Sequence, residues 1–179
     1  NEVAFAAIDA VKAYWSAGGK GVAGLHLEGP FLNVLKRGAH AADKIQEPTR
    51  ANIQKLVEYG NGVVKMMTIA PELFSDEGIK ILQESGIIIS AGHSNATYEQ
   101  ANAAFGKGIG LATHLFNAMS PFQHRAPGLA GAILDHPSVM CSVVTDGYHV
   151  DAAAIRIAKK LMGERLFIIT DAVTANTEG

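Results

Sequence analysis

The chain of 179 residues lacks several features that mark particular classes of protein. Its single cysteine, Cys141, excludes an internal disulfide and fits a reducing compartment, so we expect a cytoplasmic protein. It has no run of basic residues, and its net charge is −2, so nucleic acid is not an expected partner. No apolar stretch reaches the length of about 18 residues that a membrane-spanning helix needs, so no membrane partner is expected. The first residues lack the basic cluster of a signal peptide.

The composition is that of a soluble globular protein, with 48% hydrophobic and 18% charged residues, enough for one sizeable core. Because Cys141 stands in an apolar run, we expect it to be a small buried hydrophobe rather than a nucleophile. There is no low-complexity tract, linker or internal repeat to divide the chain.

Six apolar runs alternate with segments of helical periodicity, which is the pattern of a parallel α/β fold. The runs cover residues 21–27, 62–70, 86–92, 110–116, 139–145 and 166–170. The helical segments cover residues 1–19, 48–60, 75–86, 97–108 and 150–163, with a possible short helix in 127–137. Thr97 and Gln100 match a capping box at the start of one helix.

Two parallel α/β architectures fit this alternation. A (β/α)₈ barrel of the TIM type needs roughly 250 residues, and only about six βα units are visible here. The chain starts with a helix and ends with a strand and a loop, so we expect an incomplete portion of such a barrel, without about two units at its start. The alternative is a complete open sheet of six strands.

Polar side chains follow each of the apolar runs. In parallel α/β folds the carboxyl ends of the strands meet at one edge, where chemistry gathers. The side chains at these positions are His26, Glu28, Glu72, His93, His114, Asn117, Asp146, His149 and Asp171.

One carboxylate and two imidazoles, with water in the open position, make the ligand set of a catalytic zinc ion. Glu28, His93 and His114 could supply it from neighbouring strand ends, although their wide spacing along the chain is weak evidence. His26 competes, because strand alternation puts it on the same face as Glu28. Asp146 or Asp171 could act as the acid and base, although aspartates at such positions also serve as helix caps.

Seven segments occur in a fixed order from near residue 21 to the end of the chain: GLHLEGPFLN, KRGAH, SAGHSNAT, THLFNAM, PGLAGAILD, DGYHVD and TDAV. Together they resemble the N-acetylglucosamine-6-phosphate deacetylases, a family of the amidohydrolase superfamily. The resemblance implies a metal-dependent (β/α)₈ barrel, of which residues 1–179 would be a part. The first strands and a small flanking β-domain would be absent from this sequence.

The resemblance also implies roles for individual residues. Glu28, His93 and His114 match the ligands of one divalent ion, most simply zinc, while the absent first strand carries a second metal site in some relatives. Asp171 matches the catalytic aspartate, and His40 would stabilise the oxyanion. The positions that match substrate contacts are Ala39, His40, Asn117, Ala118, Arg125, Asp146, Gly147, Tyr148 and His149.

The implied activity is hydrolysis of the acetamide of N-acetylglucosamine 6-phosphate, in a homodimer. One alternative is a related amidohydrolase that acts on another N-acetylhexosamine phosphate or on a cyclic amide. Another is a metal-free barrel remnant that binds a sugar phosphate. An isomerase or aldolase barrel is a further alternative, but no lysine stands at a strand end to form a Schiff base, which disfavours the aldolase.

Overall fold

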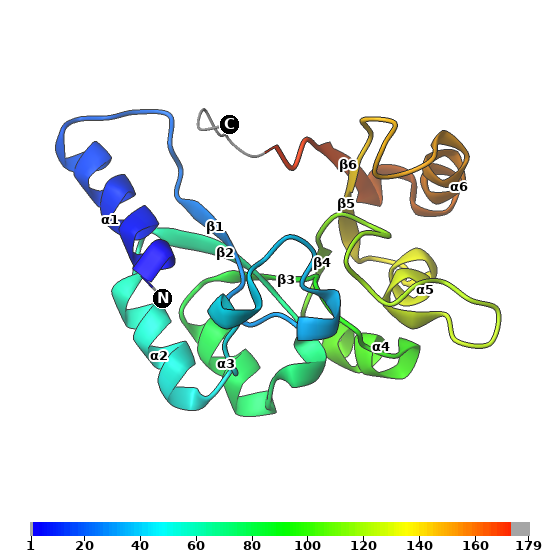
Figure 1. The fold of residues 1–179 in the computed structure, drawn as a ribbon, viewed down its shortest axis with the longest axis horizontal. Coiled ribbons are helices and arrows are strands. Elements are labelled where there is room, and N and C mark those ends of the chain that lie inside the picture. The colour runs from blue at the N-terminus through cyan, green and yellow to red at the C-terminus, as the bar shows by residue number, and fades with distance from the viewer. Residues whose placement is uncertain (1, 173–179) are drawn as a thin grey trace.

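The computed structural model describes residues 2–172 of the chain. Six strands alternate with helices along it (Figure 1). The strands are β1 (Leu25–Glu28), β2 (Val64–Ile69), β3 (Ile88–Ala91), β4 (Leu111–Ala112), β5 (Met140–Val144) and β6 (Leu166–Ile169). The helices are α1 (Glu2–Ser16), α2 (Arg50–Tyr59), α3 (Asp76–Glu84), α4 (Tyr98–Gly106), α5 (Gly128–Asp135) and α6 (Ala152–Met162). Short 3₁₀ turns cover Val34–Lys36, Ala42–Lys44, Pro71–Leu73 and Gly163–Arg165.

The strands form one parallel sheet in the order β1-β2-β3-β4-β5-β6, so each strand pairs with the next one along the chain. A doubly wound sheet would reverse its strand order at a switch point. This sheet instead curls, and the helices follow an arc on its outer side (Figure 1). The six described strands therefore make a half-barrel of the (β/α)₈ type, as the sequence predicts, and not a flat open sheet.

Helix starts follow from local capping. Thr49, Ser75 and Asp151 each accept a backbone hydrogen bond at the start of α2, α3 and α6. The predicted capping box of Thr97 and Gln100 is formed at α4. Glycine ends two of the helices in different conformations: Gly163 follows α6 with a positive φ of 57°, whereas Gly60 follows α2 with a φ of −84°.

β4 is much shorter than its apolar run of seven residues. Only Leu111 and Ala112 pair as a strand. The backbone then leaves the extended conformation, because His114, Phe116 and Ala118 have φ angles of 40°, 77° and 47°. The same run therefore forms a strand first and then an irregular loop.

The two faces of the sheet differ in character. Outward-facing residues such as Met67, Ile69 and Ile89 pack with the helices in one apolar core, and Cys141 is fully buried there, as expected. Strand alternation places the buried hydroxyls of Thr68 and Ser90 on the opposite, inner face. The curled sheet therefore has a polar interior at its centre.

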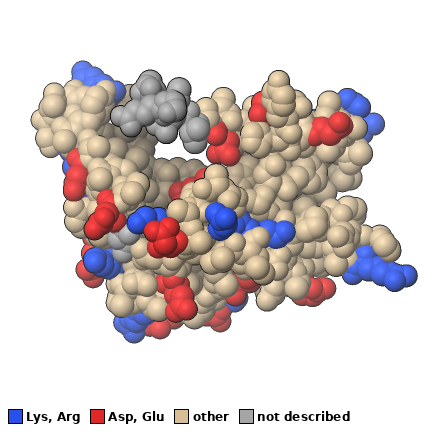
Figure 2. Space-filling view, in the orientation of Figure 1, with Lys and Arg blue, Asp and Glu red and all other residues tan. Residues whose placement is uncertain are grey.

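The outer surface carries acidic and basic side chains mixed together, without a block of one sign on the face that Figure 2 shows. Within the described part of the chain, no helix combines the length and the apolar character that crossing a membrane requires.

Candidate metal centre and active site

Glu28, His93 and His114 meet at the carboxyl ends of β1, β3 and β4. Glu28 Oε1 lies 3.1 Å from His93 Nε2 and 2.9 Å from His114 Nε2, and the two nitrogens lie 3.0 Å apart. The side chains of the two histidines are 6% and 3% exposed, and that of Glu28 is 27% exposed. Three groups separated by up to 86 positions in the sequence thus converge on one point.

The hydrogen atoms of this triangle do not suffice for its three contacts. The carboxylate has none to give, and each Nε2 carries at most one. At least one side of the triangle therefore lacks a hydrogen bond, and with His93 neutral that side joins two lone pairs, which repel one another unless a cation lies between them. Ligand atoms held about 2.0–2.1 Å from a tetrahedral zinc ion are about 3.3 Å apart, close to the spacing found here. The residues fit a divalent cation.

His93 is oriented for such a role by its other nitrogen. Its Nδ1 lies 2.8 Å from the carbonyl oxygen of Lys36, and a carbonyl only accepts, so Nδ1 carries the proton. In the neutral ring Nε2 is then left with a free lone pair, which is the usual arrangement of a metal-binding histidine. Gly38 packs closely beside this ring: an added Cβ would lie 3.2 Å from His93 Cε1, and its φ of 56° favours glycine.

His114 is held by its backbone. Its N–H donates to Ser142 Oγ at 2.8 Å, which ties the end of β4 to β5. Its Nδ1 is buried and has no hydrogen-bond partner among the residues that the structure describes. Both His93 and His114 have left-handed backbone conformations, which cost on the order of 1–3 kcal/mol each and cluster at functional sites.

The charges of the site act on one another. Burial would raise the pKa of the Glu28 carboxyl, but the interactions with His114 and His93 outweigh it and hold that pKa well below its ordinary value. Burial would lower the pKa of His114, but Glu28, helped by the charge of Asp171, raises it above 6.5. The carboxylate is therefore ionised over the whole physiological range.

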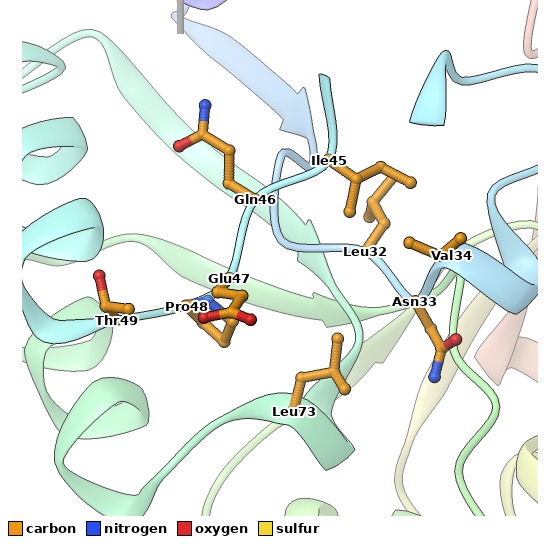
Figure 3. Close-up of a pocket in the computed structure, with 9 residues that line it drawn as sticks. All are labelled: Leu32, Asn33, Val34, Ile45, Gln46, Glu47, Pro48, Thr49 and Leu73. Atoms are coloured by element: carbon orange, nitrogen blue, oxygen red, sulfur yellow. The ribbon is translucent and has the colours of Figure 1, made fainter. Parts of the chain in front are cut away.

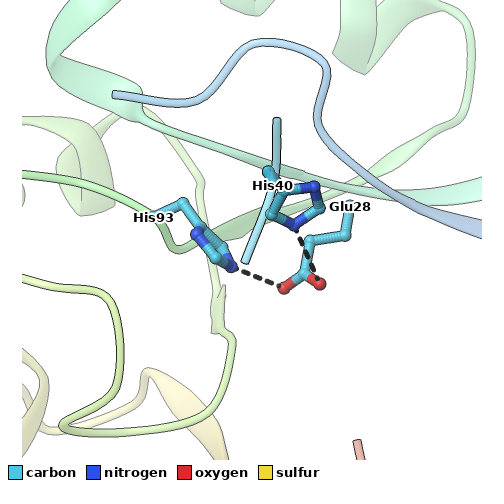
Figure 4. Close-up of side chains that lie close together, drawn as sticks. All are labelled: Glu28, His40 and His93. Carbon is cyan, nitrogen blue, oxygen red and sulfur yellow. Dashed lines mark hydrogen bonds and ion pairs between the residues drawn. The ribbon is translucent and has the colours of Figure 1, made fainter. Parts of the chain in front are cut away.

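His40 stands beside the same carboxylate on its other oxygen. Its Nε2 lies 3.5 Å from Glu28 Oε2, and its ring packs edge-on against that of His93 with centroids 4.8 Å apart (Figure 4). Ligand atoms of Glu28, His40 and His93 all lie within 4.8 Å of one another, so these residues form a second possible ligand set. The shorter distances favour His114 over His40.

Glu72 organises the loops around the centre, a role that the sequence does not reveal. Its Oε1 accepts hydrogen bonds from Asn33 Nδ2 at 2.9 Å and from the N–H of Asn95 at 2.7 Å. Its Oε2 accepts from Ser94 Oγ at 2.6 Å. The loop after β2 thereby fixes the loop after β1 and the loop after β3, which carries His93.

Asp171 follows β6 as the strand-end pattern predicts, is exposed, and has a φ of 51°. No hydrogen bond joins its side chain to the rest of residues 2–172, but its charge contributes to the pKa of His114 and of His26. The other candidate acid, Asp146, is engaged within its own loop. It accepts from His149 Nδ1 at 2.7 Å and from the N–H groups of Tyr148 and His149, which lowers its pKa to about 2.

The remaining predicted substrate contacts are spread over several loops. Ala39 precedes His40, Asn117 and Ala118 follow the irregular end of β4, and Gly147 lies beside the exposed Tyr148. The structure brings His40 to the Glu28 group by direct contact. Arg125 lies in a different hollow, of about 300 Å³, which Thr97, Ser120 and Gly128 also line.

A hollow of about 580 Å³ is separate from the Glu28 group. It lies between the loop that follows β1 and the segment that leads into α2. Figure 3 shows Ile45, Leu32 and Val34 close together, with Leu73 on the opposite side. None of the predicted site residues lines it.

Comparisons with known proteins agree with the resemblance seen in the sequence. The profile of the Amidohydrolase family matches residues 1–177. The N-acetylglucosamine-6-phosphate deacetylase of Haemophilus influenzae is 45% identical over 153 residues, which cover 85% of this chain and 40% of that protein. The N-acetylgalactosamine-6-phosphate deacetylase of a Shewanella species is 38% identical over 174 residues, 97% of this chain and 44% of that protein. The chain thus spans less than half the length of these curated relatives.

A solved structure shows the same likeness in three dimensions. It contains a mutant N-acetyl-D-glucosamine-6-phosphate deacetylase from Mycobacterium smegmatis in complex with N-acetyl-D-glucosamine-6-phosphate. The two chains are 35% identical with a TM-score of 0.86, over 96% of this chain and 45% of that one. The predicted resemblance and the half-barrel fold are both confirmed.

Proposed function

Because the chain belongs to the amidohydrolase family, whose profile matches residues 1–177, we propose that it carries the metal centre of a sugar-phosphate deacetylase. The reaction is hydrolysis of the acetamide of N-acetylglucosamine 6-phosphate to glucosamine 6-phosphate and acetate. The observation that carries this proposal is the convergence of Glu28, His93 and His114, whose three mutual contacts cannot all be hydrogen bonds.

In this proposal Glu28 Oε1, His93 Nε2 and His114 Nε2 hold one divalent ion, and zinc suits their mixed oxygen and nitrogen donors. A bound divalent ion supplies Lewis acidity, which makes water a competent nucleophile near neutral pH. His93 keeps its lone pair available because Nδ1 donates to the Lys36 carbonyl. The amidohydrolase family is metal-dependent, which agrees with a cation at Glu28. Ligand atoms of His40 and His93 also lie within 4.8 Å of the Glu28 carboxylate and of each other.

Asp171 is the proposed general base and acid. Its carboxylate accepts a proton from the attacking water, and then gives that proton to the amine nitrogen as the carbon–nitrogen bond breaks. His40, beside Glu28, donates to the oxygen that becomes negative during the attack. His40 comes from the loop after β1, where it contacts Glu28, and Asp171 follows β6.

The substrate contacts are proposals from the resemblance. Ala39, Asn117, Ala118 and the loop of residues 146–149 would contact the sugar. Arg125 and His149 would meet the phosphate, for which a guanidinium fork is well suited. No described contact joins Arg125 to the Glu28 group, so its role rests on the resemblance alone.

The sugar itself has a second candidate. The Shewanella relative that covers 97% of this chain is named for N-acetylgalactosamine 6-phosphate, which differs from the glucosamine compound at one hydroxyl. Acetate release measured on both epimers, with kcat/KM compared, decides between them. We prefer the glucosamine epimer because most of the similar curated proteins carry that name.

We further propose that residues 1–179 are part of a longer barrel domain. The chain spans 40% of its Haemophilus relative, and a closed barrel of this type has eight strands. We also propose that the full-length protein is a homodimer in the cytoplasm. Sedimentation of the purified protein measures its oligomeric state.

Replacing Asp171 tests the mechanism. In the full-length protein, Asp171→Asn removes the proton acceptor but keeps the shape, so turnover should fall by about 10²–10⁴-fold while metal content stays near that of the wild type. Acetate release and elemental analysis measure the two quantities. Asp43→Asn is the control, because its exposed side chain forms an ion pair with neighbouring Lys44, away from the Glu28 group. Wild-type turnover in Asp171→Asn would remove Asp171 from this role.

A further inference from the structure

Four polar side chains form a continuous row of hydrogen bonds on the inner face of the sheet. His26 Nε2 lies 2.7 Å from Thr68 Oγ1, Thr68 Oγ1 lies 2.8 Å from Thr113 Oγ1, and Thr113 Oγ1 lies 2.7 Å from Ser90 Oγ. The row joins β1 and β2 to the residue that follows β4 and to β3, and its three hydroxyls are 0–4% exposed. None of these residues has a role in the chemistry described above.

The direction of donation along this row follows from the number of hydroxyl hydrogen atoms in it. Three hydroxyls provide three donors for the three bonds if Ser90 donates to Thr113, Thr113 to Thr68, and Thr68 to His26 Nε2. In the opposite direction His26 Nε2 would donate to Thr68, Thr68 to Thr113, and Thr113 to Ser90. The hydroxyl hydrogen of Ser90 would then have no acceptor among the described residues. Thr113 is the single hydrogen-bond partner of Ser90 Oγ among the described residues. A buried donor without an acceptor costs about 1–3 kcal/mol, so the first direction is favoured.

We propose that this hydroxyl row fixes His26 in one tautomer, with Nε2 as acceptor and the proton on Nδ1, and so makes His26 a positioning residue of the active site. The proposal follows from the burial of Ser90 and from the three short oxygen and nitrogen distances. It does not depend on which metal or sugar the site takes.

The fixed tautomer has two consequences for the site. His26 lies two residues before Glu28 on the same face of β1, so it competes for the metal ion by position. Its Nε2 lone pair is already used by Thr68, which keeps this nitrogen from ligating. The ring then offers an N–H instead of a lone pair at Nδ1, on the face of β1 that it shares with Glu28. This second consequence rests on the proposed function, because it makes His26 a support for the proposed metal-binding carboxylate.

The tautomer can be measured without any assay of activity. Full-length protein labelled with ¹⁵N-histidine and loaded with zinc gives distinct nitrogen signals for protonated and unprotonated ring positions, and His26→Gln identifies the signals of His26. We expect Nδ1 protonated and Nε2 unprotonated. The reverse pattern, or an even mixture in the wild type, would overturn the proposal.

Two substitutions at Thr68 separate the effect of its hydroxyl group from the effect of its side-chain shape. Thr68→Val keeps the shape but removes the donor, so His26 should lose its single tautomer and kcat should fall about tenfold, the scale at which groups supporting a metal site act. Thr68→Ser keeps the hydroxyl donor, so His26 should keep its single tautomer and kcat should stay near that of the wild type. Ser16→Ala is the control, because it removes an exposed hydroxyl that donates to the Lys12 carbonyl within α1, outside the row.

These variants also distinguish this proposal from the proposed function. If the wild type released no acetate from either sugar phosphate, the function would be wrong, and the nitrogen signals would still decide the tautomer. If His26 had the same tautomer and kcat were the same in Thr68→Val and Thr68→Ser, the hydroxyl row would not fix His26. This comparison requires that both variants keep the circular dichroism spectrum of the wild type.

Discussion

The Glu28 carboxylate is the residue around which the site is built. It ends β1, keeps its charge against the cost of burial, and lies within hydrogen-bond distance of two buried imidazoles. A half-buried carboxylate with a lowered pKa beside convergent ring nitrogens is a marker of a functional site rather than of a packed core. The apolar strand therefore ends in an acid because a cation is expected at its tip.

The protonation of His114 leads to a prediction on pH. Its pKa is raised above 6.5, and the ring must be free of the proton on Nε2 to bind a metal ion. Lowering the pH through and below this raised pKa should therefore weaken metal binding, by up to about tenfold per pH unit for each proton displaced. Titration calorimetry with zinc in the full-length protein measures the affinity between about pH 8 and pH 6.

The control for this titration is His124→Asn, which removes an exposed imidazole in a loop outside the Glu28 group. Its pH dependence should equal that of the wild type. A zinc affinity that stayed constant over the whole pH range would show that zinc displaces no proton from His114. That result would argue against His114 as a ligand.

Some single residues could be predicted from the sequence, and others could not. The convergence of Glu28, His93 and His114 was predictable because each stands at or near the end of a strand-like run, and parallel strands bring their ends together. The strand pattern alone did not separate Glu28 from His26, and the resemblance made that choice. The place of His40 beside them came from the resemblance, since it stands in an irregular loop. The row from His26 to Ser90 could not be foreseen, because single hydroxyls in apolar strands reveal their partners only through the strand register.

Among the elements, the loops at the ends of β1, β2 and β3 depend on one another through Glu72. We predict that Glu72→Ala destabilises the protein by about 1.5–3 kcal/mol, because three donors lose a charged acceptor. It should also weaken zinc binding, because the loop that carries His93 is no longer fixed. Urea unfolding followed by circular dichroism measures the first effect, and zinc titration measures the second.

Glu77→Ala is the matched control for this prediction. Glu77 forms an ion pair with Arg50 at 2.7 Å, but both side chains are more than half exposed, so its loss should change stability by less than about 1 kcal/mol. If the two alanine variants were equally stable and bound zinc equally well, Glu72 would not hold the loops in place.

The elements themselves were largely predictable, because apolar runs and caps are local signals. All five expected helices are present, and the short helix in residues 127–137 is formed as α5. β4 is the main difference, since a run of seven apolar residues yields a strand of two. The left-handed backbone at His114 and beyond ends it, and hydrophobic periodicity carries no sign of such a turn.

For the molecule as a whole, the curl of the sheet is what gathers the site. Glu28, His93 and His114 come from strands that are not all neighbours, and in a flat sheet their tips would spread along an edge. The alternation of strands and helices predicts a parallel sheet, but a barrel and an open sheet share that pattern. The choice of a barrel depended on counting βα units and on the resemblance, and the strand order of the structure confirms it.

The most direct test of the account is anomalous diffraction from crystals of the full-length protein grown with zinc. We predict one strong peak bonded to Glu28 Oε1, His93 Nε2 and His114 Nε2 at about 2.0–2.2 Å. No peak at these atoms, or a peak held by other residues while His114 points away, would contradict the account.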